Sequence, residues 1–209
     1  MSLPDGVARR TFDGEARLAT RGRPVYGEPT DGEWRCWDAG RSKLAALIEA
    51  GVETGLTGGE TVLYLGAASG TTASHVADFA GPTYAVEFAP RPARDLVDVA
   101  ADRPNLFPLL KDAREPSSYA HVVEADCDAV VQDVATRGQA EVALRNRRFL
   151  APDGRLIAAI KARSEDVTAA PGDVFDRTLD ALREGYEVVG TARLAPRHDA
   201  HLGVVARPA

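Results

Sequence analysis

The chain has 209 residues, of which 44% are hydrophobic and 27% charged, and its formal net charge is −6. This suits a globular protein with one large domain or a domain with a small appendage. No apolar run approaches the roughly 18 residues of a membrane span, and the N-terminus MSLPDGVARR lacks the apolar segment of a signal peptide, so a cytoplasmic location is expected. Because phosphate neutralisation dominates non-specific RNA affinity, so acidic a chain should be a poor general RNA binder.

Residues 1–35 are expected to form a small N-terminal β domain. The stretches GVARRTF and EARLATR flank Asp13-Gly14, and this dipeptide is the strongest short hairpin signal. Residues that interrupt regular structure follow: Pro24, Gly27, Pro29 and Gly32. The arginines of this segment either contact RNA or form a solvated face among acids; they are Arg9, Arg10, Arg17, Arg21 and Arg23.

Residues 36–209 are expected to form the main domain, in which helices and strands alternate. RSKLAALIEAGVE has helical spacing with Ser42 as a cap, and TVLYLGA at residues 61–67 predicts a buried strand. The helix TASHVADFA, the strand TYAVEF at residues 83–88 and the helix RPARDLVDVAADR come next.

Further strands are predicted at NLFPLLKD, CDAVVQDV and GRLIAAIKA, separated by helices near residues 115–124 and 137–149. The helix DVFDRTLDALREG is expected to end on Gly185, before two antiparallel strands, YEVVGTARL and HLGVVAR. Such alternation predicts an α/β fold with a mostly parallel sheet covered on both faces. Five β-α steps and a terminal hairpin match a seven-stranded, Rossmann-like methyltransferase sheet better than a six-stranded dinucleotide fold.

A Gly-rich turn, YLGAASGTT, follows the first strand of this domain. Its small residues let a ligand approach the backbone, and the next helix offers free N–H groups. The G-x-x-x-G spacing from Gly66 to Gly70 differs from the G-x-G-x-x-G of nicotinamide enzymes. Taken alone, such a turn is as often structural as ligand-binding.

Acidic residues end three predicted strands: Glu87, Asp112 and Asp133. Each would lie at the carboxyl edge of the sheet, where ligands bind, and Glu87 is placed to accept hydrogen bonds from ribose hydroxyls. A single one could equally cap a helix or a turn. Together with the Gly-rich turn, the three acids predict a site for a nucleoside-like cofactor.

Five segments resemble those of fibrillarins, especially archaeal ones, in order and spacing: YLGAASGTTASHVAD, YAVEFAPRPARDL, NLFPLLKDAR, QDVA and GRLIAAIKARS. The resemblance extends from Gly6 to Arg207. It implies a class I methyltransferase fold behind a small N-terminal β domain, with S-adenosylmethionine as cofactor. The implied activity is 2′-O-ribose methylation of ribosomal RNA, with transfer RNA as a second substrate, guided by a C/D box small RNA.

The same resemblance implies the residues that bind the cofactor. Thr71 and Thr72 match paired threonines at the start of a helix. Glu87 and Phe88 match contacts to the ribose and the adenine, and Asp112 matches an acceptor for the adenine amine. The implied set is Gly66, Ala68, Thr71, Thr72, Glu87, Phe88, Asp112, Ala113, Asp133, Val134, Ala135 and Thr136.

One position departs from the family pattern. Thr136 stands where fibrillarins have the glutamine of DVAQ, so the contact of that amide is shortened or lost. Gln139 lies too far along the following helix to replace it.

Methyl transfer to a ribose hydroxyl needs an aligned 2′-oxygen and help in removing its proton. Lys161 follows the apolar run RLIAAI, where an unpaired charge would be desolvated, so it either forms a structural pair with Asp133 or takes part in chemistry. Lys43 alone would be a solvated helix charge. These are two of only three lysines, the third being Lys111, in a chain that otherwise uses arginine, which suggests that arginine would not serve there.

The resemblance implies a catalytic set of Lys43, Asp133, Lys161 and His201, similar to the Lys-Asp-Lys-Glu tetrad of 2′-O-methyltransferases. Our hypothesis is that Lys161 accepts or relays the hydroxyl proton while Asp133 orients it. Lys43 and His201 would then hold the ribose and the RNA backbone. His198 is an alternative for the last place, because the family usually has Asp-His there and this chain has HDAH.

The resemblance also implies partners: a Nop-domain scaffold protein, a kink-turn-binding ribosomal-type protein and a C/D box guide RNA that pairs with the target. This route agrees with an acidic catalyst that lacks a basic stripe. The alternatives are a stand-alone small-molecule methyltransferase, a non-catalytic assembly subunit and, more remote, a nicotinamide dehydrogenase. No metal is expected, because Cys36, Cys127 and the four histidines lack ligand spacing.

Overall fold

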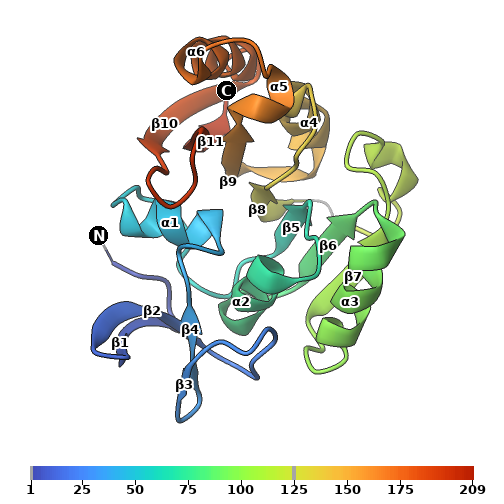
Figure 1. The fold of residues 1–209 in the computed structure, drawn as a ribbon. Helices are drawn as coiled ribbons and strands as arrows, with labels where there is room; N and C mark the ends of the chain where they lie inside the picture. Colours follow the sequence, from blue (N-terminus) through green and yellow to red (C-terminus); the bar gives the residue numbers. More distant parts are fainter. Residues whose placement is uncertain (1, 124–125) are drawn as a thin grey trace.

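The N-terminal segment of the computed structural model, which describes residues 2–123 and 126–209, forms a four-stranded antiparallel sheet (Figure 1). Its strands are β1 (Val7–Phe12), β2 (Glu15–Arg21), β3 (Thr30–Asp31) and β4 (Trp34–Trp37). The predicted hairpin is confirmed: Asp13 and Gly14 join β1 to β2 with φ of 52° and 82°, the positive values that Asp-Gly turns require.

Strands β3 and β4 were not predicted. All four residues of β4 are buried, so the strand lacks the alternation that marks a half-exposed one. The domain boundary expected after residue 35 falls inside β4, which pairs with β2. The division of the chain into two domains stays a prediction.

A second sheet, of seven strands within the described residues, carries the rest of the chain. Its order is β10-β11-β9-β8-β5-β6-β7, and β11 alone runs antiparallel to its neighbours, as the predicted α/β fold with a terminal hairpin requires. The strands are β5 (Val62–Leu65), β6 (Thr83–Glu87), β7 (Leu106–Leu110), β8 (Cys127–Gln132), β9 (Leu150–Lys161), β10 (Tyr186–Arg193) and β11 (His201–Pro208). The chain leaves β5 toward β6 and later returns beside β5 as β8, so a crevice opens between the carboxyl ends of β5 and β8.

Helices cover both faces of this sheet (Figure 1). They are α1 (Lys43–Glu49), α2 (Thr71–Phe79), α3 (Pro90–Ala100), α4 (Gln139–Asn146), α5 (Ala162–Glu165) and α6 (Pro171–Leu182), with 3-10 turns η1 (Pro116–Ser118) and η2 (Arg147–Phe149). Apolar residues of α1, α2 and α3 pack on one face together with the N-terminal sheet, and those of α4 and α6 pack on the other. Ser42 caps α1 as predicted, accepting a hydrogen bond from the Ala45 N–H (3.2 Å). In the described part of the chain, no helix combines the length and apolarity needed to cross a membrane.

One predicted helix and the predicted end of another are wrong, although the second helix is present as α6. Residues 115–123 form η1 and further turns instead of a helix, residue 124 lying outside the described residues, because Tyr119 is held by tertiary hydrogen bonds to Asn146 and the Ala113 carbonyl. Helix α6 ends at Leu182, short of Gly185. Gly185 serves packing instead, since a Cβ there would come within 2.8 Å of the Leu144 side chain.

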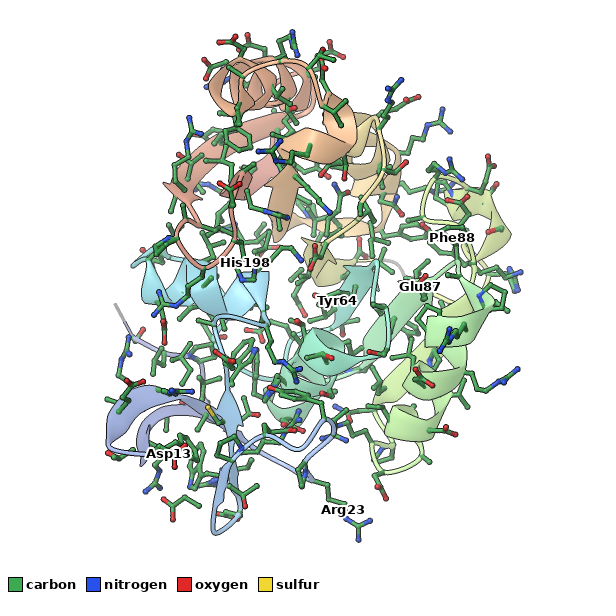
Figure 2. The ribbon with its side chains drawn as sticks, viewed as in Figure 1. Asp13, Arg23, Tyr64, Glu87, Phe88 and His198 are labelled. Carbon is green, nitrogen blue, oxygen red and sulfur yellow. The ribbon has the colours of Figure 1, made fainter. Side chains whose placement is uncertain are left out.

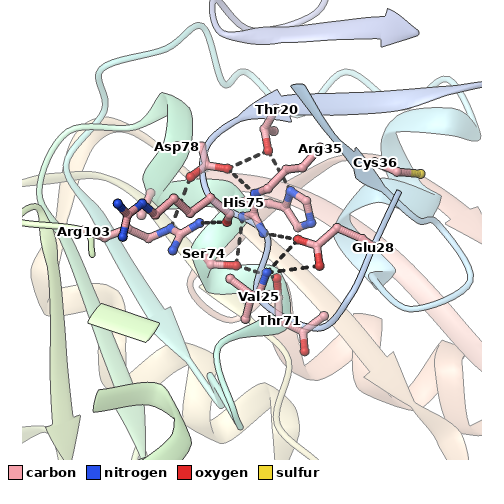
Figure 3. Close-up of polar contacts among 12 residues, drawn as sticks. Thr20, Val25, Glu28, Arg35, Cys36, Thr71, Ser74, His75, Asp78 and Arg103 are labelled. Atoms are coloured by element: carbon pink, nitrogen blue, oxygen red, sulfur yellow. Dashed lines mark hydrogen bonds and ion pairs between the residues drawn. The ribbon is translucent and has the colours of Figure 1, made fainter. Parts of the chain in front are cut away.

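A buried cluster of charges joins the N-terminal sheet to the main domain (Figure 3). The side chain of Arg35 on β4 is 0% exposed, and it donates to Glu28 (Nη1 to Oε1, 2.6 Å) and to Asp78 of α2 (Nε to Oδ2, 2.7 Å). Arg103 donates to the other oxygen of Asp78 (3.2 Å). Two cations and two anions thus neutralise one another away from water, which buried charges require.

His75 of α2 lies beside this cluster and is fully buried. Its Nδ1 is 2.7 Å from the Thr20 hydroxyl and its Nε2 is 3.1 Å from the Tyr26 hydroxyl. Burial, and then the charges of two neighbouring arginines, hold the pKa of His75 well below its usual value. The folded protein therefore keeps this imidazole neutral.

We expect Asp78→Asn to lower the free energy of unfolding by about 3–5 kcal/mol, because it leaves two buried guanidinium groups with one carboxylate. Urea denaturation would measure this. The control is Asp180→Asn, which breaks an exposed pair with Arg183 and should cost less than about 1 kcal/mol. Equal losses in the two variants would contradict the importance of the buried cluster.

We also expect stability to fall with acidification below pH about 6.5, because the unfolded chain binds a proton at His75 that the folded chain excludes. This group alone should contribute about 1.4 kcal/mol per pH unit below that pH. Urea denaturation between pH 7.5 and 5.5 should show that the free energy of unfolding of His75→Gln changes less with pH than that of wild type. The exposed His121→Gln serves as the control and should follow the wild type. Parallel curves for wild type and His75→Gln would refute the assignment.

Candidate functional site

The candidate site lies at the carboxyl edge of the seven-stranded sheet, where the turn after β5 meets the end of β8. Gly66 has a φ of 82°, and a Cβ there would collide with the backbone oxygen of Asp133. Only glycine lets these two strand ends approach so closely. Gly70, with a φ of 87°, is the N-cap of α2, so the Gly-rich turn ends where the free N–H groups of that helix begin.

Glu87 is held in place at the end of β6. Its Oε2 accepts a hydrogen bond from the Ala68 N–H (2.9 Å) and its Oε1 accepts one from the Ala89 N–H (2.8 Å). Each oxygen keeps further acceptor capacity for ligand hydroxyls. The adjacent Phe88 is 66% exposed, and Figure 2 shows the two residues near each other at this edge. A fixed carboxylate and an open ring suit a ribose and a flat base.

A cavity of about 320 Å³ opens beside Glu87, within the size range of small-molecule sites. Ten of the residues predicted to bind the cofactor line it: Gly66, Ala68, Glu87, Phe88, Asp112, Ala113, Asp133, Val134, Ala135 and Thr136. Val86, Lys111 and Arg114 also line it and were not predicted, although each is a sequence neighbour of a predicted residue. Their adjacency to Glu87, Asp112 and Ala113 was the only signal in the sequence.

The two predicted threonines do not line this cavity. Thr72 is buried in α2, and Thr71 lines a neighbouring hollow together with Tyr26 and Ser69. Both stand in the first turn of α2, directly after the Gly-rich turn. Their contact with a cofactor stays a prediction.

Asp112 is engaged by a residue that sequence reasoning overlooked. The Arg114 guanidinium lies 2.6 Å from Asp112 Oδ2, and the Arg114 N–H donates to Oδ1 (2.9 Å). The hydrogen bonds from the guanidinium have the largest effect, and together with the one from the backbone N–H they hold the pKa of Asp112 below its usual value. Asp112 is therefore a charged acceptor at the cavity wall, shared between Arg114 and any ligand amine.

Asp133 pairs with Lys43 and not with Lys161, whose structural pair with Asp133 was one of two alternatives. Lys43 Nζ lies 2.9 Å from Asp133 Oδ2, and both side chains are about one quarter exposed. Ala158 of β9 pairs with Gln132, the last residue of β8 and the one before Asp133. Lys161 lies three positions further along β9, beyond the end of β8. Lys43, at the start of α1, reaches the carboxylate instead, and no ion pair involves Lys161 within the described residues.

Strand pairing brings His201 to the same edge. The register of β11 against β9 sets His201 opposite Lys161. His198 lies beside His201, with their ring centroids 5.9 Å apart, and its Nε2 is 2.8 Å from the Ala39 carbonyl oxygen. Strand register thus sets His201 opposite Lys161, and the choice between the two histidines stays a prediction.

The tautomer of His201 follows from its hydrogen bond. Its Nδ1 lies 2.7 Å from the Asp199 carbonyl, which can only accept, so Nδ1 carries the proton and Nε2 the free lone pair. Burial lowers the pKa of His201, and the charge of Lys43 acts in the same direction. A neutral imidazole thus stands beside the Lys43–Asp133 pair.

Comparison with known proteins places these features in one family. The family model described as Fibrillarin matches residues 7–209. A fibrillarin-like rRNA/tRNA 2′-O-methyltransferase of Halorubrum lacusprofundi is 72% identical over 99% of this chain and 98% of its own length.

Two solved structures match almost completely. Fibrillarin of Aeropyrum pernix, in complex with natively bound S-adenosyl-L-methionine, has 43% identity and a TM-score of 0.84, covering 96% of this chain and 97% of that one. The fibrillarin chain of a fibrillarin/Nop5p complex has 36% identity and a TM-score of 0.91, covering 100% of both chains.

We expect Glu87→Gln to weaken S-adenosylmethionine binding about tenfold or more, because hydrogen bonds to a charged acceptor contribute about 1.5–3 kcal/mol. Isothermal titration calorimetry would measure the Kd. The exposed Glu184→Gln, far from the cavity, serves as the control and should bind like wild type. An unchanged Kd for Glu87→Gln would remove Glu87 from the site.

Proposed function

Since the chain belongs to the fibrillarin family, we propose that it transfers methyl groups from S-adenosylmethionine to ribose 2′-hydroxyls of ribosomal RNA and transfer RNA. The proposal rests on Asp133, which belongs both to the cavity and to the group of charged residues beside it. Asp133 lines the cavity, and its carboxylate pairs with Lys43 (2.9 Å) at the edge where Lys161 and His201 are opposite each other. A nucleoside cavity and a set of proton-handling groups therefore meet at one residue.

The cavity fits S-adenosylmethionine by its own chemistry. Glu87 offers a fixed carboxylate to ribose hydroxyls, Phe88 offers an exposed ring to the adenine, and Asp112 offers an acceptor to the adenine amine. When bound, this cofactor supplies a methyl group on a sulfonium centre, which has an excellent leaving group. Thr136 also lines the cavity, and its side chain is shorter than the glutamine that other fibrillarins have at this position.

The remaining task of the enzyme is to orient the ribose and to handle the proton of a weakly acidic hydroxyl. Lys43 holds the Asp133 carboxylate, so Lys161 Nζ is the group available to accept or relay that proton. The Nε2 of neutral His201 is buried and has no hydrogen-bond partner among the described residues, so its contact with the RNA stays the hypothesis drawn from the sequence. The sequence hypothesis thus changes in one respect: Asp133 orients Lys43 rather than Lys161.

Delivery of the RNA is proposed to depend on partners. The net charge of −6 disfavours unaided RNA binding, and a matched fibrillarin was solved with Nop5p, which supports a Nop-domain partner here. We propose that a kink-turn-binding protein and a C/D box guide RNA complete the complex, in the cytoplasm, with base pairing choosing the target. A small-molecule methyltransferase and a non-catalytic subunit are the competing functions.

Transfer of tritium from labelled S-adenosylmethionine to target RNA separates these functions. We expect transfer in the reconstituted guide complex and none to RNA by the free chain. Transfer to small acceptors would favour the small-molecule enzyme, and complete inactivity with intact cofactor binding would favour the assembly subunit.

In the same assay, Lys161→Ala should lower transfer at least about 100-fold, the usual scale of lost acid-base catalysis, while cofactor affinity stays intact. The exposed Arg183→Ala should transfer like wild type. Near-normal turnover of Lys161→Ala would contradict the proposed role of Lys161.

A further inference from the structure

Lys161 ends β9 at a place where its backbone has lost one strand partner. β8 stops at Gln132, which faces Ala158, so the backbone of Lys161 extends beyond β8. On the other side β11 sets His201 opposite Lys161, and the next bond of that ladder runs from the Ala162 N–H to the Ala200 carbonyl (3.0 Å). Because hydrogen-bonded and non-bonded pairs alternate along an antiparallel ladder, the N–H and C=O of Lys161 point away from β11.

The side-chain amide of Gln139, the first residue of α4, takes the place of the missing strand. The Lys161 N–H donates to Gln139 Oε1 (2.8 Å), and Gln139 Nε2 donates to the Lys161 carbonyl (3.1 Å). Gln139 is 0% exposed. A neutral amide can offer one donor and one acceptor together, as a peptide group does, and so it satisfies both backbone groups of Lys161.

Gln139 is itself held from two sides. Glu165 Oε1 accepts from the Gln139 N–H (2.6 Å) and from its Nε2 (3.0 Å), while Oε2 accepts from the Gly138 N–H (2.9 Å). A carboxylate at this helix N-terminus is favoured by the helix dipole. The Gln139 carbonyl accepts from Gln132 Nε2 (2.8 Å), and Gln132 directly precedes Asp133.

We propose that Gln139 is a positioning residue for methyl transfer, which fixes the backbone of Lys161 relative to Asp133; this inference rests on the proposed function. It acts through the main chain, so it touches neither cofactor nor RNA. It also explains why Gln139 does not replace the glutamine that Thr136 lacks: both ends of its amide are committed to Lys161 and Glu165. Without this amide the base of the Lys161 side chain would lose its anchor on the β8 side.

The test uses Gln139→Leu in the reconstituted guide complex. We expect kcat to fall about 10- to 100-fold, because displacements near 1 Å can cost that much, with KM for S-adenosylmethionine unchanged. The matched control is Tyr186→Phe, which also removes one buried hydrogen bond of α4, from the Tyr186 hydroxyl to the Ala143 carbonyl (3.0 Å), away from Lys161. A normal kcat for Gln139→Leu, or an equal loss in Tyr186→Phe, would overturn the proposal.

A double variant separates positioning from general destabilisation. In the Lys161→Ala background, Gln139→Leu should cause no further loss of kcat, since the residue it positions is gone. A loss of the same factor in both backgrounds would show that Gln139 does not act through Lys161.

A second readout does not require turnover. The chain has only three lysines, so lysine labelled with carbon-13 and nitrogen-15 gives three resolvable side-chain signals by NMR, assigned with Lys161→Ala. Gln139→Leu should shift and sharpen the Lys161 signal and leave that of Lys111 in place. An unmoved Lys161 signal would refute the positioning role, whereas a wild-type complex that transfers no methyl would instead refute the proposed function.

Discussion

The paired charges of Arg35 connect the N-terminal sheet to the helix that follows the Gly-rich turn. Besides Glu28 and Asp78, the Arg35 guanidinium donates to the Ser74 hydroxyl (2.9 Å), which donates in turn to the Thr71 carbonyl (3.0 Å), as Figure 3 shows. This chain of hydrogen bonds reaches the first turn of α2, directly after the Gly-rich turn. Because an unpaired buried charge costs several kcal/mol, all members of the cluster must be in place together. Through them the small β sheet stabilises the first turn of α2 beside the site.

The site itself is a consequence of where parallel strands end. Gly66 follows β5 and Asp133 follows β8, and these strands are neighbours at the point where the strand order reverses. Lys43 is 90 positions from Asp133 along the chain, yet it begins a helix on the same edge. His201 arrives there because β11 returns antiparallel against β9. The topology therefore gathers the proposed catalytic groups, which are distant in sequence.

Sequence reasoning succeeded where a signal is local and failed where a partner is distant. Asp13-Gly14 encodes its own turn, and the apolar runs before Glu87 and Asp133 encode buried strands. Strand β4 was missed because all four of its residues are buried, and the burial of Arg35 depends on Asp78, which is 43 positions away in the sequence. The partner of Gln139 is also distant in the sequence. Gln139 lies too far along its helix to replace the glutamine missing at position 136, and nothing in the sequence showed that it hydrogen-bonds to Lys161.

The sequence by itself determined the α/β fold, the edge at which ligands bind, ten residues of the cavity lining and, through family resemblance, the chemistry. The fold and the edge follow from periodicity, turn residues and strand ends, which depend on short stretches of chain, whereas the set of lining residues was implied by the family resemblance. Only the tertiary structure decided which charges pair: Asp133 with Lys43, Asp112 with Arg114, and Arg35 with Glu28 and Asp78. Pairing depends on distances of a few ångströms between elements that pack from far apart in the sequence, and those distances exist only once the strands have taken their register.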